Sequence, residues 1–209
     1  MLGRLPRMIR LGAIVFSVCL VSQTAFAFNY PLQPEEVRNA YSLGKTTNNE
    51  ELIKFYDRYV HYFPAPTGNS PIYVQSVEFR TPYEQIVLRT QQNLNSYTSF
   101  RADEDYRANP GLVVVRTIVA YKTSYNYVGP QPTAEGFKIA VSQKDAIEPQ
   151  KITTETICSP LLDDRCTVMT FAVVAWFDAE QFAPGTARIK IETPDGQTIR
   201  TKFDLDKLT

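Results

Sequence analysis

The chain has 209 residues, of which 22 are Lys or Arg and 22 are Asp or Glu, so its formal net charge is zero. An apolar share of 44% and a charged share of 21% are typical of a globular protein and exclude a disordered or collagenous chain. A net charge of zero also lacks the positive excess of nucleic-acid binders, so we expect no nucleic-acid partner. One histidine and three cysteines leave few residues for a zinc site or for histidine-based catalysis.

The first 27 residues have the pattern of a secretory signal peptide. Arg4, Arg7 and Arg10 precede an apolar run over residues 11–21, and Ala25-Phe26-Ala27 supplies an A-x-A cleavage site. A helix of this run would rise only about 16 Å, whereas a bilayer core is about 30 Å thick. We therefore expect cleavage after Ala27, export to the periplasm or the exterior, and no transmembrane segment in the mature chain.

Residues 28–70 are predicted to form an extended arm followed by two helices. The arm covers residues 28–34, where two prolines favour extended backbone. A first helix is expected from Pro34 to about residue 43, because proline and acids stand at its start and Gly44 at its end. A second helix is expected over residues 50–63, because four apolar side chains recur at helical spacing: Leu52, Tyr56, Tyr59 and Phe63.

The remainder of the chain is predicted to be mainly β, with one inserted helix. Residues 72–80 have the composition of a strand with a possible bulge, and the sequence from Thr81 to Glu84 has a capping-box pattern that predicts a helix near 82–95. Beyond Gly111 come further segments rich in β-branched residues, at 112–122, 137–142, 151–157, 167–177, 187–193 and 197–203. Short strands without helices between them predict an antiparallel sandwich.

The clearest turn is the sequence Thr-Pro-Asp-Gly-Gln at residues 193–197. Its Asp-Gly pair supplies the positive φ of a tight hairpin. The flanking segments 188–192 and 198–203 alternate apolar and charged residues, which indicates one buried face and one face in water.

Parts of this β region resemble a known kind of domain. Residues 176–205 resemble the closing strands of immunoglobulin-like sandwich domains in exported bacterial proteins, and residues 137–149 resemble an earlier strand and turn. The sequence VEFRTPYE at residues 77–84 is similar to an element of uncharacterised exported bacterial proteins. The resemblance implies an immunoglobulin-like sandwich and implies no activity and no cofactor.

These expectations give an α+β fold, an N-terminal helical region followed by an antiparallel immunoglobulin-like β-sandwich. We divide the chain into the signal peptide 1–27, the arm and helical region 28–70, and the sandwich 71–209.

The densest charge cluster lies at residues 101–107. Asp103, Glu104 and Asp105 carry the oxygen ligands that calcium prefers, but the flanking Arg101 and Arg107 also suit a self-neutralised, solvated loop. Whether this acidic loop binds calcium stays open. A hydrolase acting on envelope polysaccharide would use paired carboxylates, and Asp103 or Asp105 are the candidates for that alternative function.

Cys158 and Cys166 are predicted to form a disulfide. They are the two cysteines left after signal cleavage, and an exported protein meets an oxidising compartment. The segment between them contains a proline and two aspartates and is expected to form the loop of a hairpin with the cysteines at its base. Their separation is too short for the bridge between sheets of antibody domains and lacks the C-x-x-C spacing of redox sites.

Other patterns do not indicate catalysis. Gly44-Lys45-Thr46-Thr47 lacks the rest of a phosphate-binding loop and is expected to end a helix, and His61 is expected to be a packing residue. Tyr125 and Tyr127 suit either packing or ligand binding. We therefore predict an exported, non-catalytic binding or assembly protein of the bacterial envelope, with an unknown protein or carbohydrate partner and no metal or cofactor.

Overall fold

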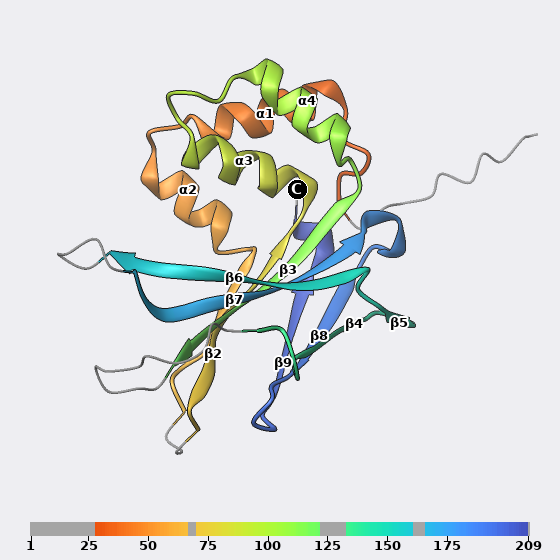
Figure 1. Cartoon of the computed structure of the whole chain (residues 1–209). Coiled ribbons are helices and arrows are strands. Elements are labelled where there is room, and N and C mark those ends of the chain that lie inside the picture. The colour runs from red at the N-terminus through yellow and green to blue at the C-terminus, as the bar shows by residue number, and fades with distance from the viewer. Residues whose placement is uncertain (1–27, 67–69, 122–132, 161–165, 209) are drawn as a thin grey trace, which may run out of the picture.

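The computed structural model describes residues 28–66, 70–121, 133–160 and 166–208, and it has an α+β fold (Figure 1). Helices from the N-terminal half stand together at one end of two antiparallel sheets. The predicted fold class is therefore confirmed at this level. The helices are α1 (Pro34–Gly44), α2 (Asn49–Tyr56), α3 (Pro82–Gln92) and α4 (Ser99–Ala108).

The larger sheet, sheet A, has five strands in the order β1-β2-β3-β7-β6, and the smaller, sheet B, has four in the order β5-β4-β8-β9. The strands of sheet A are β1 (Val60–Tyr62), β2 (Ile72–Arg80), β3 (Leu112–Tyr121), β7 (Cys166–Asp178) and β6 (Lys151–Pro160). Those of sheet B are β5 (Ala146–Ile147), β4 (Lys138–Ser142), β8 (Thr186–Glu192) and β9 (Thr198–Asp204). Two short 3-10 turns follow β7 and β9, η1 (Ala179–Gln181) and η2 (Leu205–Lys207).

The main core lies between the two sheets and continues under the helices. Aromatic rings join the layers: the Phe79 ring centroid of sheet A lies 5.6 Å from that of Phe203 in sheet B. The predicted arm enters this core, since Phe28 is buried with its ring centroid 6.4 Å from that of Phe79 and 6.2 Å from that of Phe182. Each such side chain contributes roughly 1.5–3 kcal/mol through burial.

The opposite, outer face of sheet A carries a second, smaller apolar cluster. Its buried members are Val114, Ile118, Ala172 and Val174. Leu112, Ile157 and Trp176 are partly buried against them.

Close packing fixes the position of α1 on α3. A Cβ placed on Gly44, at the end of α1, would lie 2.5 Å from Thr90 Cβ and 2.7 Å from the Val87 carbonyl oxygen. Helix α3 starts directly after β2, where Thr81 Oγ1 accepts a hydrogen bond of 3.3 Å from the Glu84 amide. This is the predicted helix start, and α3 ends at Gln92 rather than near residue 95.

Two sequence predictions in the helical part were wrong. The predicted helix over residues 50–63 is α2 followed by β1, because the chain turns after Tyr56 and then pairs with the edge of β2. There Val60 and Tyr62, residue types that favour strands, lie opposite Glu78 and Ser76. Leu52 and Tyr59 of the predicted apolar stripe are nevertheless buried.

The second error is the expected acidic loop at residues 101–107, which lies within α4. Thr98 caps this helix, with its Oγ1 accepting a 3.2 Å hydrogen bond from the Arg101 amide. The predicted β segments were more accurate: the bulge in β2 falls between Val74 and Ser76, and β8 and β9 form the expected hairpin.

The predicted hairpin around the two cysteines is present as β6 and β7. The register sets Cys158 opposite Val168 and Cys166 opposite Pro160, so the two cysteines are not direct partners in the ladder. Their side chains and the connecting residues 161–165 lie outside the described part of the chain. The disulfide therefore stays a prediction.

Candidate functional site

The two carboxylates proposed for hydrolysis do not form a facing pair. Asp103 and Asp105 are two positions apart on α4, a spacing that places side chains on different sides of a helix. Asp103 Oδ2 lies 2.6 Å from Arg107 Nη2, which agrees with the prediction that the flanking arginines neutralise these acids. Asp105 Oδ2 lies 2.7 Å from Nη1 of Arg89, which comes from α3.

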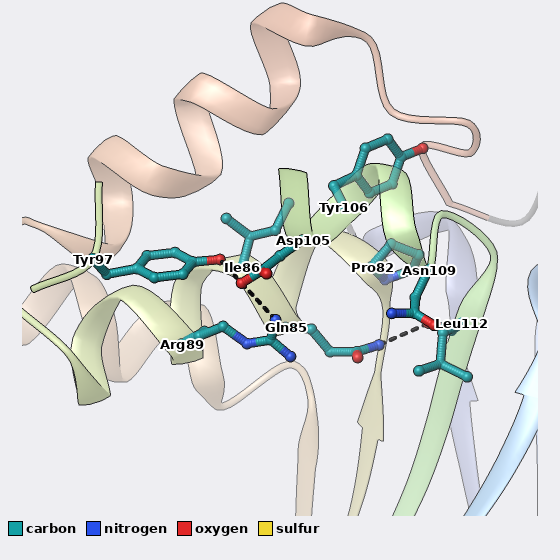
Figure 2. A pocket seen from close by; sticks show the side chains of 9 residues that line it. All are labelled: Pro82, Gln85, Ile86, Arg89, Tyr97, Asp105, Tyr106, Asn109 and Leu112. Atoms are coloured by element: carbon teal, nitrogen blue, oxygen red, sulfur yellow. Dashed lines mark hydrogen bonds and ion pairs between the residues drawn. The ribbon is translucent and has the colours of Figure 1, made fainter. Parts of the chain in front are cut away.

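Asp105 belongs to a small polar joint between α3 and α4 (Figure 2). The hydroxyl of Tyr97 donates a 2.8 Å hydrogen bond to the same Asp105 oxygen that Arg89 contacts. Burial acts to raise the pKa of Asp105, but the hydrogen bonds from Arg89 and Tyr97 outweigh it and lower that pKa below its usual value. An acid held ionised in this way is poorly suited to donate a proton.

The cavity beside this joint is too small for a substrate. It has a volume of about 40 Å³, which at about 10–15 Å³ per water molecule holds only a few waters. Gln85 closes one side by donating a 2.7 Å hydrogen bond from Nε2 to the Leu112 carbonyl, which ties α3 to the start of β3 (Figure 2). We interpret this place as a structural joint.

His61 lies where β1 of sheet A meets β9 of sheet B. Its Nδ1 is 2.6 Å from Thr201 Oγ1, and its ring centroid is 4.5 Å from that of Phe203. Burial lowers the pKa of His61, which favours the neutral ring. These contacts fit the packing role expected from the sequence.

The Gly44-Lys45 pair ends a helix, as predicted. Lys45 follows the end of α1, and its amide donates a 3.1 Å hydrogen bond to the Tyr41 carbonyl. Tyr125 and Tyr127 lie outside the described residues. Across the described ranges, no group of three or more His, Cys, Asp or Glu side chains is arranged to hold a metal ion.

The most distinctive charged surface is the outer face of sheet B, which we call the basic face. It consists of Arg188 and Lys190 on β8 and Arg200 and Lys202 on β9, all exposed. The hairpin register sets Arg188 opposite Lys202 and Lys190 opposite Arg200. Like charges directly opposed across two strands destabilise a sheet, so this arrangement opposes folding.

Little negative charge compensates the basic face. Lys190 Nζ lies 2.5 Å from Glu192 Oε1. The other carboxylate oxygen of Glu192, Oε2, lies 3.6 Å from Lys138 Nζ. Arg188, Arg200 and Lys202 have no ion pair with any residue that the structure describes. The side chains border a shallow hollow of about 610 Å³, whose rim includes Ser142 and His61. This face is therefore an open, cationic surface.

Sequence reasoning missed the basic face because the total charge of the chain is zero. The sequence nevertheless contains a signal for it, because cations alternate with uncharged residues in segments 188–192 and 198–203, on either side of the Asp-Gly turn. That turn fixes the register, and the register sets cations opposite cations.

No protein-family model matches the chain, and no curated protein matches it either. Among the helices of the described residues, none combines the length and the apolar character needed to cross a membrane.

Proposed function

We propose that the protein is an exported, non-catalytic binding module of the bacterial envelope, and that the basic face of sheet B is its binding surface. The single observation that carries this proposal is the set of four exposed cations opposed in pairs across β8 and β9. Residues arranged against stability in this way are typical of functional surfaces. The signal-peptide pattern supports export, and the antiparallel two-sheet architecture supports the immunoglobulin-like resemblance.

The ligand that fits this surface is an anionic polysaccharide. Neighbouring cations on one strand are about 6.8 Å apart and cations on adjacent strands about 5 Å apart, so charge repeats along a flat surface. Half of the basic face is lysine and none of it is aromatic, whereas protein interfaces are centred on aromatic, apolar and arginine anchors and are depleted in lysine. The aliphatic stems that border the hollow add apolar contacts for sugar rings.

Binding of this kind is electrostatic and should weaken with salt. Exposed charges are screened over about 8 Å at physiological ionic strength, and release of counterions from a polyanion makes affinity fall steeply with salt. Specificity would come from the hydrogen bonds that Arg188 and Arg200 offer in a fixed fork to carboxylate or phosphate groups.

The test is calorimetric titration of the exported chain with polygalacturonate, with dextran as the neutral probe. We expect saturable binding to polygalacturonate alone, and at least tenfold weaker binding after the double substitution Arg188→Gln and Lys202→Gln. The matched control is Arg38→Gln with Lys151→Gln, which removes two exposed cations from α1 and β6. Equal loss in both double variants, or no binding, would contradict the proposal. Binding only to an acidic protein would assign a different ligand to this face and would also contradict it.

A further inference from the structure

A cleft between α3 and the outer face of sheet A forms a second candidate binding site, remote from the basic face. Helix α3 contributes Gln85, Arg89 and Gln92, which recur at positions four and three apart and so lie on one side of the helix. The sheet contributes Arg116, Glu155 and Trp176. The space between them has a volume of about 200 Å³.

The floor of the cleft is apolar and its walls are polar. Val114 and Val174 of the smaller apolar cluster line the cleft together with Leu112 and Trp176, and Val114 lies directly opposite Trp176 in the ladder. The indole is held in place by a 3.2 Å hydrogen bond from Trp176 Nε1 to Thr153 Oγ1. An aromatic side chain next to hydrogen-bonding groups provides both an apolar surface and polar contacts for a small ligand.

An ion-pair network holds the polar wall in one arrangement. The carboxylate of Glu78 lies 2.5 Å from Arg80 Nη2 through Oε2 and 3.2 Å from Arg116 Nη1 through Oε1. The Nε of Arg116 lies 3.1 Å from Glu155 Oε2, on the far side of β7. The side chain of Arg116 is only 16% exposed. A guanidinium fixed by two carboxylates needs little reordering when it binds a ligand.

Several hydrogen-bonding groups in this wall remain available. Arg116 Nη2 and the amide of Gln92 have no hydrogen-bond partner in the part of the chain that is described. Gln85 uses Nε2 to donate to the carbonyls of Leu112 and Arg80, which leaves its Oε1 as an acceptor. The cleft therefore offers donors and acceptors side by side.

The cleft carries no excess charge. Its arginines, Arg80, Arg89 and Arg116, are balanced by the carboxylates of Glu78, Asp105 and Glu155. A neutral site that mixes donors and acceptors around an aromatic ring suits a ligand whose groups both donate and accept. Sugar hydroxyls have this property.

We propose that the cleft between α3 and sheet A binds one unit of a neutral oligosaccharide against Trp176. The balanced charge, the mixed hydrogen-bonding groups and the volume of about 200 Å³ all suit one sugar unit. This inference does not depend on the basic face, which would take an anionic polymer.

The experiment uses Trp176 as its own reporter, because it is the only tryptophan in the chain. The exported protein is titrated with N-acetylglucosamine tetramer, cellotetraose and maltotetraose while tryptophan emission is recorded. We expect a saturable change with at least one of them at or below millimolar concentration. Gln92→Ala should weaken that binding about five- to tenfold, the value of one hydrogen bond.

The matched control is Gln75→Ala, which removes an exposed glutamine from β2 without touching the cleft. It should leave the affinity unchanged. No emission change with any of the three sugars would overturn the proposal, as would equal weakening by Gln92→Ala and Gln75→Ala. Folding of each variant is checked by far-UV circular dichroism, and if Gln92→Ala fails to fold, Gln92→Glu replaces it with the same expected loss.

Discussion

The wild-type protein should lose stability as the pH rises, because the buried carboxyl of Glu84 must then ionise. Replacing Glu84 with glutamine should abolish this loss. Glu84 stands in the first turn of α3, and its side chain is buried, at 3% exposed for the residue. Its Oε2 has no hydrogen-bond partner among the described residues. Burial raises the pKa of Glu84 to about 8, while the charges of Arg80 and Arg116 act to lower it and that of Glu78 to raise it.

The sign follows from proton linkage. The carboxyl titrates near 4.5 when the chain is unfolded and near 8 when it is folded, so the folded state holds the proton more tightly. The resulting stability is fully present below pH 4.5 and is lost as the pH rises to about 8. Within that window the loss approaches 1.4 kcal/mol per pH unit, or about 2.5 kcal/mol between pH 5 and pH 7.

The measurement is urea unfolding of the wild type and of Glu84→Gln at pH 5, 6 and 7. The free energy of unfolding of the variant minus that of the wild type should increase by about 2.5 kcal/mol across this range. Contributions of other titrating groups cancel in this difference. Glu104→Gln, an exposed change on α4, measures the effect of removing an exposed carboxylate. A difference for Glu84→Gln that does not change with pH would refute the reasoning.

Three further predictions concern packing and covalent structure. Tyr59→Ala should lower the free energy of unfolding by about 3–5 kcal/mol in urea titrations, because the residue is 1% exposed; a loss below 1 kcal/mol would contradict its place in the core. Gly44→Ala should cost about 1–3 kcal/mol by the same assay, because the added Cβ meets Thr90, and an unchanged midpoint would show that α1 can move away from α3. Mass spectrometry of the non-reduced protein, recovered after the export that we propose, should show Cys158 and Cys166 joined, and two free thiols would refute that bridge.

The β region was predictable because its signals are local. The strands β8 and β9 follow from two-residue alternation and from an Asp-Gly turn, and both features depend only on neighbouring residues. The start of α3 was equally local, since Thr81 and the following proline set the cap.

The errors arose where a distant segment decided the structure. Residues 60–62 continue a helical apolar pattern, yet they pair with the edge of β2, a segment separated from them by a loop. The acids of residues 101–107 were expected in a loop because their charge pattern suits solvent, but they lie in a helix capped by Thr98, where Asp103 pairs with Arg107 and Asp105 with Arg89 of α3.

The candidate sites depended still more on tertiary structure. The basic face forms only when β8 pairs with β9. The Asp-Gly turn predicted this pairing, but the net charge of zero gave no sign of a cationic surface. The cleft joins α3 to residues on β3, β6 and β7. Arg116 on β3 reaches Glu155 on β6 across β7, whose Val174 lies opposite Arg116 and whose Ala172 lies opposite Glu155. No spacing rule in the sequence indicates such a neighbourhood.

The most direct test of the central claim is to map polyanion binding onto the backbone. The chain from residue 28 onward, labelled with ¹⁵N, is titrated with short polygalacturonate at low ionic strength while amide chemical shifts are followed. We predict that the largest shifts occur at Arg188, Lys190, Arg200 and Lys202 and that they vanish at high salt. Shifts centred on the helices or on sheet A, with β8 and β9 unchanged, would contradict the assignment of the basic face as the binding surface.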